Sequence, residues 1–586
     1  MLLSRQQRAG RSLGATILSK WRTKMLVPYA RSMSSGNLMG LMQRKELLVS
    51  GILDHAALCH GDKEVVSRTI EDPAKLHRYT FSDVETRSKK LANALVGLGI
   101  HRGERVGTIA WNGYRHLELY YAISGSGAVL HTMNPRMSPD QLALVINHAE
   151  DKVLFVDLTF FPIIAAIHSK IECEHVVVMT DKANMPEHSL PKNVICYEDL
   201  IQGESSSFVW PQLDENSACA LCYTSGTTGM PKGVLYSHRS TVLHGMSLTT
   251  ANSLNLGSRD SCLPIVPMFH VNAWGIPYGA IMSGCRLVFP GSAMDGKSVH
   301  ELLKGEKVTA TAGVPTVWQM LLQHMDDTNE SLPDLNRILI GGTTCPPEMM
   351  RKFEEDYGIW VQHAWGMTEM SPTGVVNELP PLKGGADAGK PISERSEEER
   401  KKLRQGRTLY GVELKCVDSD GKEVPRDGKT QGELMAKGFW VTGQYFKVDK
   451  PAVNAQGWFD TGDISTMTAD GYMEVVDRTK DLIKSGGEWI SSIELENVAM
   501  GHPDVAQAAA IAIPDAKWGE RPLLLFVLKP SAASPAPEVA AELKKMLTKA
   551  LPKWSVPERV EQAEALPIGG TGKVLKNKLR DMYTSK

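Results

Sequence analysis

The sequence predicts an α/β protein of layered sheets, with a large N-terminal domain and a smaller C-terminal domain of α+β type. Three observations support this prediction. With 586 residues, the chain is too long for one ordinary hydrophobic core. Short β-branched runs alternate with helical patterns over most of its length, which is the order that layered α/β sheets require. The composition changes after Asp477, where we expect the boundary between the two domains.

Strands and helices are expected in turn through the larger domain. The residues predict a strand at 105–111, a helix near residue 117, a strand at 128–133, a helix from residue 139, and further strands at 152–157, 175–180, 286–289, 309–314 and 337–340. The helix start at Pro139 is well marked, because Ser138 and Gln141 form a capping box and proline suits the first helical position. The charged stretch 394–404 predicts a solvated helix or excursion without a function.

The C-terminal part has its own pattern of two strands, at 506–513 and 523–528, followed by a helix at 537–551. Together they predict a separate domain of roughly 100 residues. The junction at residues 477–481, Asp-Arg-Thr-Lys-Asp, is charged. A hinge and an ordinary charged domain junction are equally good interpretations of that composition.

Bulk composition excludes several classes of protein. The 65 basic residues are balanced by 67 acidic ones, so the chain lacks the electrostatic signature of a nucleic-acid-binding protein. No run approaches the roughly 18 apolar residues that a transmembrane helix needs, and none is expected. The nine cysteines are scattered, and the close pair Cys219 and Cys222 lies in an apolar run. We expect buried strand thiols in a reducing compartment rather than a redox or zinc site.

The N-terminal segment is basic. Arginines and lysines, interleaved with Leu, Ile, Trp and Ser, precede the first acidic residue, Glu46. This composition is typical of a mitochondrial transit peptide. We therefore expect a transit peptide at 1–33, cleaved near residues 31–34, and a location in the mitochondrial matrix; a basic leader without function and plastid import are the alternatives. The two domains are then expected at 34–479 and 480–586.

The segment 223–233, Tyr-Thr-Ser-Gly-Thr-Thr-Gly-Met-Pro-Lys-Gly, directly follows an apolar run. Hydroxyls and backbone N–H groups on a glycine-rich turn can surround phosphate oxygens, and a lysine supplies the positive charge that a triphosphate requires. The segment is not a Walker A loop, because Pro231 stands five residues after Gly226, where a second glycine should be. We interpret it as a nucleotide-phosphate loop; a polar surface turn is the alternative.

Three further segments suit a nucleotide. In the segment 363–369, the indole of Trp365 can pack against a purine, and Glu369 offers the oxygen ligand that Mg²⁺ prefers. Asp463 follows a strand-like run in a tight turn, where a carboxylate can accept both ribose hydroxyls. Lys573 lies on a glycine-rich loop and can there neutralise charge on a phosphoryl oxygen. Taken singly, a surface turn, an acidic turn cap and a solvated lysine are the commoner explanations.

Together, these segments resemble the adenylate-forming superfamily of acyl-CoA synthetases, luciferases and peptide-synthetase adenylation domains. The resemblance rests on five motifs in one order: YTSGTTGMPKG, AWGMTE, WFDTGD, DRTKDLIKSGGEWIS and GTGK. It implies an N-terminal adenylation domain with a β-barrel-like subdomain and a mobile C-terminal domain that rotates about Lys480. It also implies that a carboxylate attacks the α-phosphorus of ATP to give an acyl-adenylate and pyrophosphate, after which a thiol displaces AMP. ATP, Mg²⁺ and coenzyme A are the implied cofactor and cosubstrates.

The resemblance assigns roles residue by residue. The catalytic residues are Lys573, which assists adenylation, Glu369 and His270, and the Mg²⁺ ligands are Thr224 and Glu369. The residues implied at the phosphates are Thr224, Ser225, Gly226, Thr227, Thr228, Gly229, Lys232 and Thr368; those at the adenine are Gly342, His363, Ala364 and Trp365; those at the ribose are Asp463 and Arg478. Further contacts to ATP are assigned to Lys480, Lys484, Trp489 and Lys573.

The remaining assignments concern coenzyme A and the acid. When the C-terminal domain rotates, Ser485, Gly486 and Gly487 would admit the pantetheine arm close to the backbone. His270 would lie near the carboxylate, and Trp274 stands where long-chain relatives have an aromatic gate to the acyl tunnel. A satisfied core histidine and a core-packing tryptophan are the alternatives. The chain departs from its relatives at Tyr410, where proline is frequent, and at His363 and Trp365, which affects the adenine contacts.

These residues predict an ATP- and Mg²⁺-dependent acid:CoA ligase for an apolar monocarboxylic acid of medium to long chain. The segment 267–274 and the motif DLIKSGGEWIS are most similar to fatty acyl-CoA synthetases and the related medium-chain and methylmercaptopropionyl-CoA ligases. One alternative keeps adenylation but changes the acid or acceptor: an aromatic acid, a luciferase-like oxygenation or a carrier protein. Another is a non-catalytic nucleotide-binding scaffold. The expected partners are small molecules; a homodimer is compatible with the sequence, which contains no signal for oligomeric state.

Overall fold

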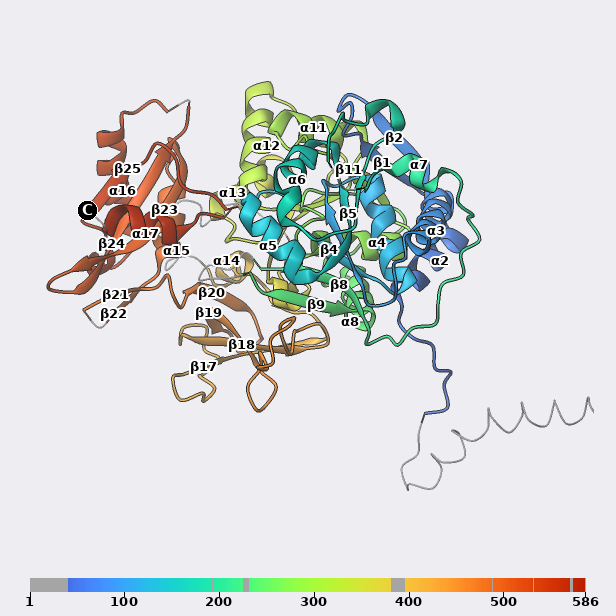
Figure 1. Ribbon diagram of the computed structural model, residues 1–586. Coiled ribbons are helices and arrows are strands. Elements are labelled where there is room, and N and C mark those ends of the chain that lie inside the picture. Colours follow the sequence, from blue (N-terminus) through green and yellow to red (C-terminus); the bar gives the residue numbers. More distant parts are fainter. Residues whose placement is uncertain are drawn as a thin grey trace, which may run out of the picture. The chain divides into compact units, whose positions relative to one another are not determined.

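Two mixed β-sheets, each covered by helices, carry most of the chain (Figure 1). The computed structural model describes residues 40–190, 193–224, 231–380, 396–486, 488–530, 532–569 and 573–584. Leu47–Lys586 forms one unit, and residues 40–46 belong to a separate N-terminal unit, Met1–Glu46. The predicted transit peptide and its cleavage site lie outside the described residues.

The first sheet has seven strands in the order β7-β6-β5-β3-β4-β8-β9. Neighbouring strands are parallel except β8 and β9, which are antiparallel. The strands are β3 (Arg105–Ile109), β4 (Val129–Thr132), β5 (Asp151–Val156), β6 (His175–Val178), β7 (Asn193–Cys196), β8 (Ala218–Tyr223) and β9 (Gly233–Ser237). Cys219 and Cys222 are buried on β8, as predicted.

Both faces of this sheet are buried, because alternate residues of a strand point to opposite sides. In β5, Val153 and Phe155 belong to the core that includes α3 and α4, whereas Leu154 and Val156 pack with α5 and α6. Ser138 caps α5 as the sequence predicts. The helices are α3 (Phe81–Gly97), α4 (Tyr114–Ser126), α5 (Pro139–Ala149), α6 (Phe161–Ile167), α7 (Tyr197–Gln202) and α8 (His238–Leu248).

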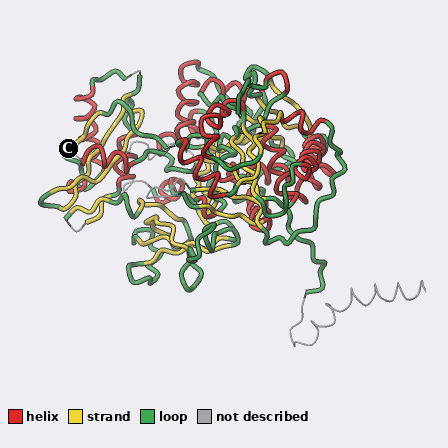
Figure 2. The backbone as a smooth tube through the Cα atoms, viewed as in Figure 1, coloured by secondary structure: helices red, strands yellow, loops and turns green. Residues whose placement is uncertain are grey.

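The second sheet has nine strands in the order β16-β15-β14-β13-β12-β10-β11-β1-β2, with a parallel centre and antiparallel edges. Figure 2 shows strands in the interior of the larger part with helices around them. The strands are β1 (Glu64–Arg68), β2 (Leu76–Thr80), β10 (Ser261–Pro264), β11 (Arg286–Phe289), β12 (Ala310–Gly313), β13 (Arg337–Ile340), β14 (Trp360–Gly366), β15 (Thr373–Val376) and β16 (Arg407–Thr408). Its helices are α2 (Val49–His60), α9 (Val271–Trp274), α10 (Ile276–Ser283), α11 (Gly296–Gly305), α12 (Pro315–Thr328) and α13 (Pro347–Arg351).

A four-stranded antiparallel sheet takes the place of the expected barrel-like subdomain. Its strands are β17 (Val412–Val417), β18 (Gly432–Gly438), β19 (Phe459–Met467) and β20 (Met473–Arg478), and within the described residues β17 does not pair with β20. The β18–β19 register shifts between Glu433 and Met435, opposite the stretch of β19 that contains Gly462 with φ of 69°. This bulge explains why Asp463 lies inside a strand and not in the predicted turn at a strand end.

The predicted helix at 394–404 is present as α14 (Glu397–Leu403), but it is not simply solvated. Lys402 is buried, with Nζ 2.9 Å from Glu354 Oε1, and both side chains are at most 3% exposed. The Lys402 ammonium also donates hydrogen bonds to Val361 O and Leu379 O. A charged side chain can be buried only when it is paired and hydrogen-bonded, a condition that charge patterning along the sequence does not reveal.

The C-terminal part consists of a five-stranded sheet with helices on both faces. Leu524 and Phe526 of β24 pack with α15 and α16, and Leu523 and Leu525 pack with α17. Its elements are β21 (Ile483–Ser485), β22 (Glu488–Ile490), β23 (Val505–Asp515), β24 (Gly519–Leu528), β25 (Arg559–Gln562), α15 (Ser492–Met500), α16 (Ala536–Ala550) and α17 (Lys576–Thr584).

The junction before the C-terminal part is only partly exposed. Asp477 is buried, and its Oδ2 accepts hydrogen bonds of 2.6 Å from both N–H and Oγ–H of Ser492. Asp477 therefore belongs to the packed structure and not to a solvated linker. The boundary at residues 479 and 480 stays a prediction. Among the helices of the described ranges, none is both long and apolar enough to cross a membrane.

Candidate active site

A cavity of about 750 Å³ opens where the parallel strands of both sheets end. Its lining includes the residues that follow the carboxyl ends of β3, β8, β10, β12 and β13, which are Trp111, Thr224, Ile265, Val314 and Gly341. In open α/β sheets, ligands bind at these strand ends. Of these positions, Trp111 and Val314 are the last residues of predicted strands and Gly341 directly follows one, whereas no strand was predicted before Ile265; only Thr224 was singled out from the sequence.

The cavity brings together most of the predicted site residues that the structure describes. They come from segments far apart in the sequence, and the lining includes Thr224, Lys232, His270, Trp274, Gly342, Ala364, Trp365, Thr368, Glu369, Arg478 and Lys573. His363, Asp463, Lys480, Lys484, Ser485, Gly486 and Trp489 do not line it. Ser225, Gly226, Thr227, Thr228, Gly229 and Gly487 lie outside the described residues. The role assigned to each of these residues stays a prediction.

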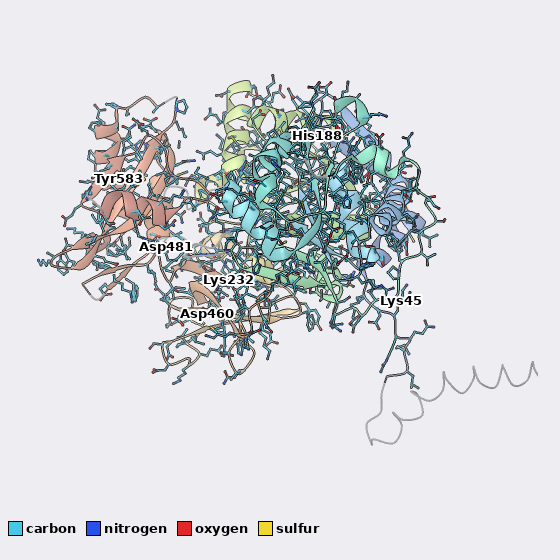
Figure 3. All side chains as sticks on the ribbon, in the orientation of Figure 1. Lys45, His188, Lys232, Asp460, Asp481 and Tyr583 are labelled. Carbon is cyan, nitrogen blue, oxygen red and sulfur yellow. The ribbon has the colours of Figure 1, made fainter. Side chains whose placement is uncertain are left out.

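Thr224 and Lys232 close the base of the phosphate segment. Thr224 N–H donates to Lys232 O at 2.9 Å, and Lys232 N–H donates to Thr224 Oγ1 at 3.4 Å. Lys232, labelled in Figure 3, directly precedes β9. A hydroxyl and an ammonium from the two ends of the segment therefore face one cavity, which suits phosphate oxygens.

Asp463 lies behind the cavity wall and orients two residues that form it. Its Oδ2 accepts a 2.8 Å hydrogen bond from Trp365 Nε1, and its Oδ1 lies 3.0 Å from Arg478 Nε. Asp460, three residues earlier in β19, is labelled in Figure 3. An ionised carboxylate has about four acceptor positions, so these two contacts leave capacity for hydroxyl donors.

His363 is held inside the protein and does not face the cavity. Cys345 N–H donates to its Nε2 at 3.2 Å, and its Nδ1–H donates to Leu403 O at 3.0 Å. Burial lowers the pKa of His363 to about 4, so the ring stays neutral. The next residues of β14, Ala364 and Trp365, reach the cavity instead.

Lys573 and His270 face the same cavity, and their charges are coupled. Burial lowers the pKa of Lys573 to about 8, as does the positive charge of Arg478, while Asp463 and Glu369 oppose the shift. Burial, and then the Lys573 charge, lowers the pKa of His270 to about 4. At neutral pH the site therefore presents a cationic lysine beside a neutral imidazole.

The apolar side of the cavity ends at an unusual turn. Val271, Asn272, Ala273 and Trp274 all have φ between 47° and 56°, the left-handed region that residues other than glycine rarely adopt. The turn directs the Trp274 indole onto Gly341, where an added Cβ would lie 3.2 Å from Trp274 Cη2. The neighbouring lining residues are Ile265, Val266, Phe269, Met294, Val314, Val317 and Leu339.

The oxygens of Thr224 and Glu369 fit Mg²⁺, which prefers oxygen ligands. In the described part of the chain, no group of three or more His, Cys, Asp or Glu side chains could hold a metal ion. Mg²⁺ is usually bound through one or two protein oxygens together with substrate phosphates and water. The donor set therefore fits the predicted ion.

Sequence reasoning missed Tyr445 and Phe446, which also line the cavity. Tyr445 OH donates a 2.8 Å hydrogen bond to Glu369 Oε1. The only local signal was a pair of adjacent aromatic residues in the polar loop between β18 and β19. Aromatic pairs are common in packed loops, so the signal has little specificity.

Comparisons with known proteins agree with this geometry. A family model described as "AMP-binding enzyme" matches residues 53–446, and one described as "AMP-binding enzyme C-terminal domain" matches residues 494–573. The chain belongs to the AMP-binding enzyme family. The predicted superfamily is thereby confirmed.

This AMP-binding enzyme has close relatives that are named CoA ligases. It is 47% identical over 548 residues to the medium-chain-fatty-acid–CoA ligase of Ectopseudomonas oleovorans, covering 93% of this chain and 98% of that protein. It is also 47% identical over 549 residues to the 3-methylmercaptopropionyl-CoA ligase of Ruegeria lacuscaerulensis, with 93% and 99% covered. The long-chain-fatty-acid–CoA ligase of Thermus thermophilus is 43% identical, with 92% and 96% covered.

Solved structures show the same fold for this AMP-binding enzyme. The anthranilate CoA ligase AuaEII in complex with anthranoyl-AMP matches with a TM-score of 0.80 at 24% identity, covering 92% of this chain and 98% of that one. ATP-bound MatB from Rhodopseudomonas palustris matches with a TM-score of 0.74 at 24% identity, with 92% and 99% covered. These matches confirm the predicted α/β class with a large N-terminal and a smaller C-terminal part.

Proposed function

We propose that this AMP-binding enzyme is an ATP-dependent acid:CoA ligase that forms an acyl-adenylate and transfers the acyl group to coenzyme A. The observation that best supports this proposal is that one cavity contains Lys573, Lys232, Glu369 and an apolar pocket beside Trp274. The relatives named as CoA ligases, at 43% to 47% identity over nearly their whole length, support the same reaction.

In the first half-reaction, a carboxylate oxygen of the acid attacks the α-phosphorus of ATP and pyrophosphate leaves. Thr224 and Glu369 would hold Mg²⁺ together with the phosphates, and the ion would supply positive charge where two anions meet. Lys232 holds the phosphates, and Lys573 neutralises the charge that builds on the phosphoryl oxygens. His270 would lie near the acid. Because its ring is neutral near pH 7, it adds no second positive charge beside Lys573.

In the second half-reaction, the coenzyme A thiol attacks the acyl carbonyl, loses its proton and releases AMP. We propose that the C-terminal domain rotates about Lys480, withdraws Lys573 and brings residues 484–489 to the cavity. In the arrangement described here, Lys573 lines the cavity, and Lys484 stacks over Trp489 elsewhere, with Nζ 4.7 Å from the ring centroid. This arrangement suits the first half-reaction.

The proposed acid is an apolar monocarboxylate of medium to long chain. The lining beside Trp274 is aliphatic and aromatic, and burial of each methylene there favours binding by about 0.8 kcal/mol. The names of the relatives point to medium-chain and long-chain fatty acids and to 3-methylmercaptopropionate as the first acids to compare.

Acid-dependent pyrophosphate release tests this proposal. The panel contains short-, medium- and long-chain fatty acids, 3-methylmercaptopropionate and aromatic acids, with and without coenzyme A. We expect release with aliphatic acids and thioester only with coenzyme A. ATP binding without acid-dependent release would instead identify a nucleotide-binding scaffold, and preference for aromatic acids would refute the assigned acid.

We also propose a location in mitochondria and a homodimer. Residues 1–33 would direct import into the mitochondrial matrix, since their composition is basic and free of acidic residues. A fluorescent protein fused after residue 46 should then enter mitochondria, and a diffuse signal would refute the assignment. The homodimer is tested by light scattering of the purified chain.

A further inference from the structure

Tyr445 contacts two groups that the proposed reaction needs. Its hydroxyl donates to Glu369 Oε1 at 2.8 Å, and its ring lies beneath the ammonium of Lys232, with Nζ 4.8 Å from the ring centroid. Tyr445 also lines the cavity. A single side chain outside the predicted motifs therefore joins the carboxylate assigned to Mg²⁺ and the lysine assigned to the phosphates.

The loop that carries Tyr445 is fixed on both sides of it. Before Tyr445, Thr442 N–H donates to Glu369 O at 2.8 Å. After Tyr445, Phe446 N–H donates to Gly233 O, also at 2.8 Å. The backbone around Tyr445 is thus hydrogen-bonded to Glu369 and to Gly233, which directly follows Lys232. These contacts hold the phenol in place relative to Glu369 and Lys232.

The hydroxyl leaves Glu369 able to bind a cation. It occupies Oε1, and Glu369 itself lines the cavity. A phenol is protonated at neutral pH, so the hydroxyl remains a donor to the carboxylate. A carboxylate fixed in one rotamer by a supporting hydrogen bond binds a metal with less loss of side-chain freedom.

We propose that Tyr445 is a positioning residue for the metal–triphosphate group: its hydroxyl fixes the Glu369 carboxylate for Mg²⁺, and its ring face fixes the Lys232 ammonium for the phosphates. This inference rests on the proposed adenylation reaction. It adds a residue whose effect is on metal and nucleotide binding.

Two substitutions separate the two contacts. Tyr445→Phe removes the hydroxyl and keeps the ring beneath Lys232, whereas Tyr445→Leu removes both. Tyr410→Phe is the matched control, because Tyr410 is 91% exposed and does not line the cavity. The natural chain and all variants are purified at full length and compared without acid, so that no turnover occurs.

The readout is Mn²⁺ binding in the presence of ATP, followed by the enhanced relaxation of water protons when the Mn²⁺–ATP complex binds protein. We expect Tyr445→Phe to weaken this binding about tenfold, the effect of losing a hydrogen bond to a charged group, and to leave metal-free ATP binding unchanged. Tyr445→Leu should weaken metal-free ATP binding as well. Tyr410→Phe should match the natural chain.

Each contrary result has a distinct meaning. Mn²⁺–ATP binding by Tyr445→Phe within twofold of the natural chain would overturn the positioning role while leaving the proposed function intact. If Glu369→Gln bound Mn²⁺–ATP as well as the natural chain, Glu369 would not be a ligand and the inference would fail with it. A natural chain that binds no Mn²⁺–ATP at all would refute the proposed function itself.

Discussion

The cavity wall and the groups proposed to act in it differ in how they are held. Wall residues such as Val314 and Gly341 directly follow buried parallel strands, so the two sheets fix their positions. Lys573 and the segment 484–489 come from the C-terminal part, and among their described residues only Lys573 lines the cavity. In the proposed mechanism, ATP and acid bind to the part of the cavity formed by the two sheets, whereas the C-terminal part supplies a different group to each half-reaction.

Removal of Lys573 is expected to produce the largest difference in rate between the two half-reactions. Lys573→Ala is expected to slow acyl-adenylate formation by about 100- to 1,000-fold, the loss typical of one preorganised charge-stabilising group. Thioester formation from preformed acyl-adenylate should persist, because that step does not use Lys573. The two half-reactions are measured separately by pyrophosphate release and by thioester yield; equal losses would refute the exchange.

A substitution in the packed N-terminal part should lower stability without distinguishing between the two half-reactions. Lys402→Met leaves Glu354 buried without its partner and is expected to lower the free energy of unfolding by about 3–5 kcal/mol. Both half-reactions of the folded protein should be slowed equally or not at all. Denaturant unfolding measures the loss, with Lys75→Met in the exposed Lys75–Asp72 pair as a control expected to change it by less than about 1 kcal/mol.

The pKa of Lys573 predicts a pH limb for one half-reaction only. The ammonium loses its proton as pH rises through about 8, so adenylation should decline above that pH. Well above it, kcat/KM for ATP should fall about tenfold per pH unit, because this parameter reports groups of the free enzyme. Thioester formation should lack this limb, and a flat adenylation profile would contradict a role for the charged lysine.

A smaller effect should appear in the segment assigned to coenzyme A. Gly486 has φ of 61°, and an added Cβ would lie 2.6 Å from the Trp518 ring. Gly486→Val is therefore expected to slow transfer to coenzyme A about tenfold, as one strained position would, while adenylation persists and reports correct folding. Gly203→Val, where an added Cβ meets nothing within 4 Å, is the control.

The sequence was a good guide to strands and motifs and a poor one to the contacts between them. Strands predicted at 286–289 and 337–340 have these bounds in β11 and β13, because short β-branched runs between turn residues leave little ambiguity. Asp463 was expected in a turn, since a bulge within a strand has no clear sequence signature. The burial of Lys402 and the hydrogen bond from Tyr445 to Glu369 depend on residues far apart in sequence.

If Trp274 borders the acyl pocket as proposed, the left-handed turn at Val271–Trp274 sets stability against selectivity. Four consecutive residues other than glycine hold a conformation that costs each of them about 1–2 kcal/mol. Glycine in place of Ala273 would relieve part of this cost and raise the melting temperature, yet it would also let the indole sample other directions. A heat-resistant descendant of this chain selected at that position would therefore discriminate less well between acids of different length.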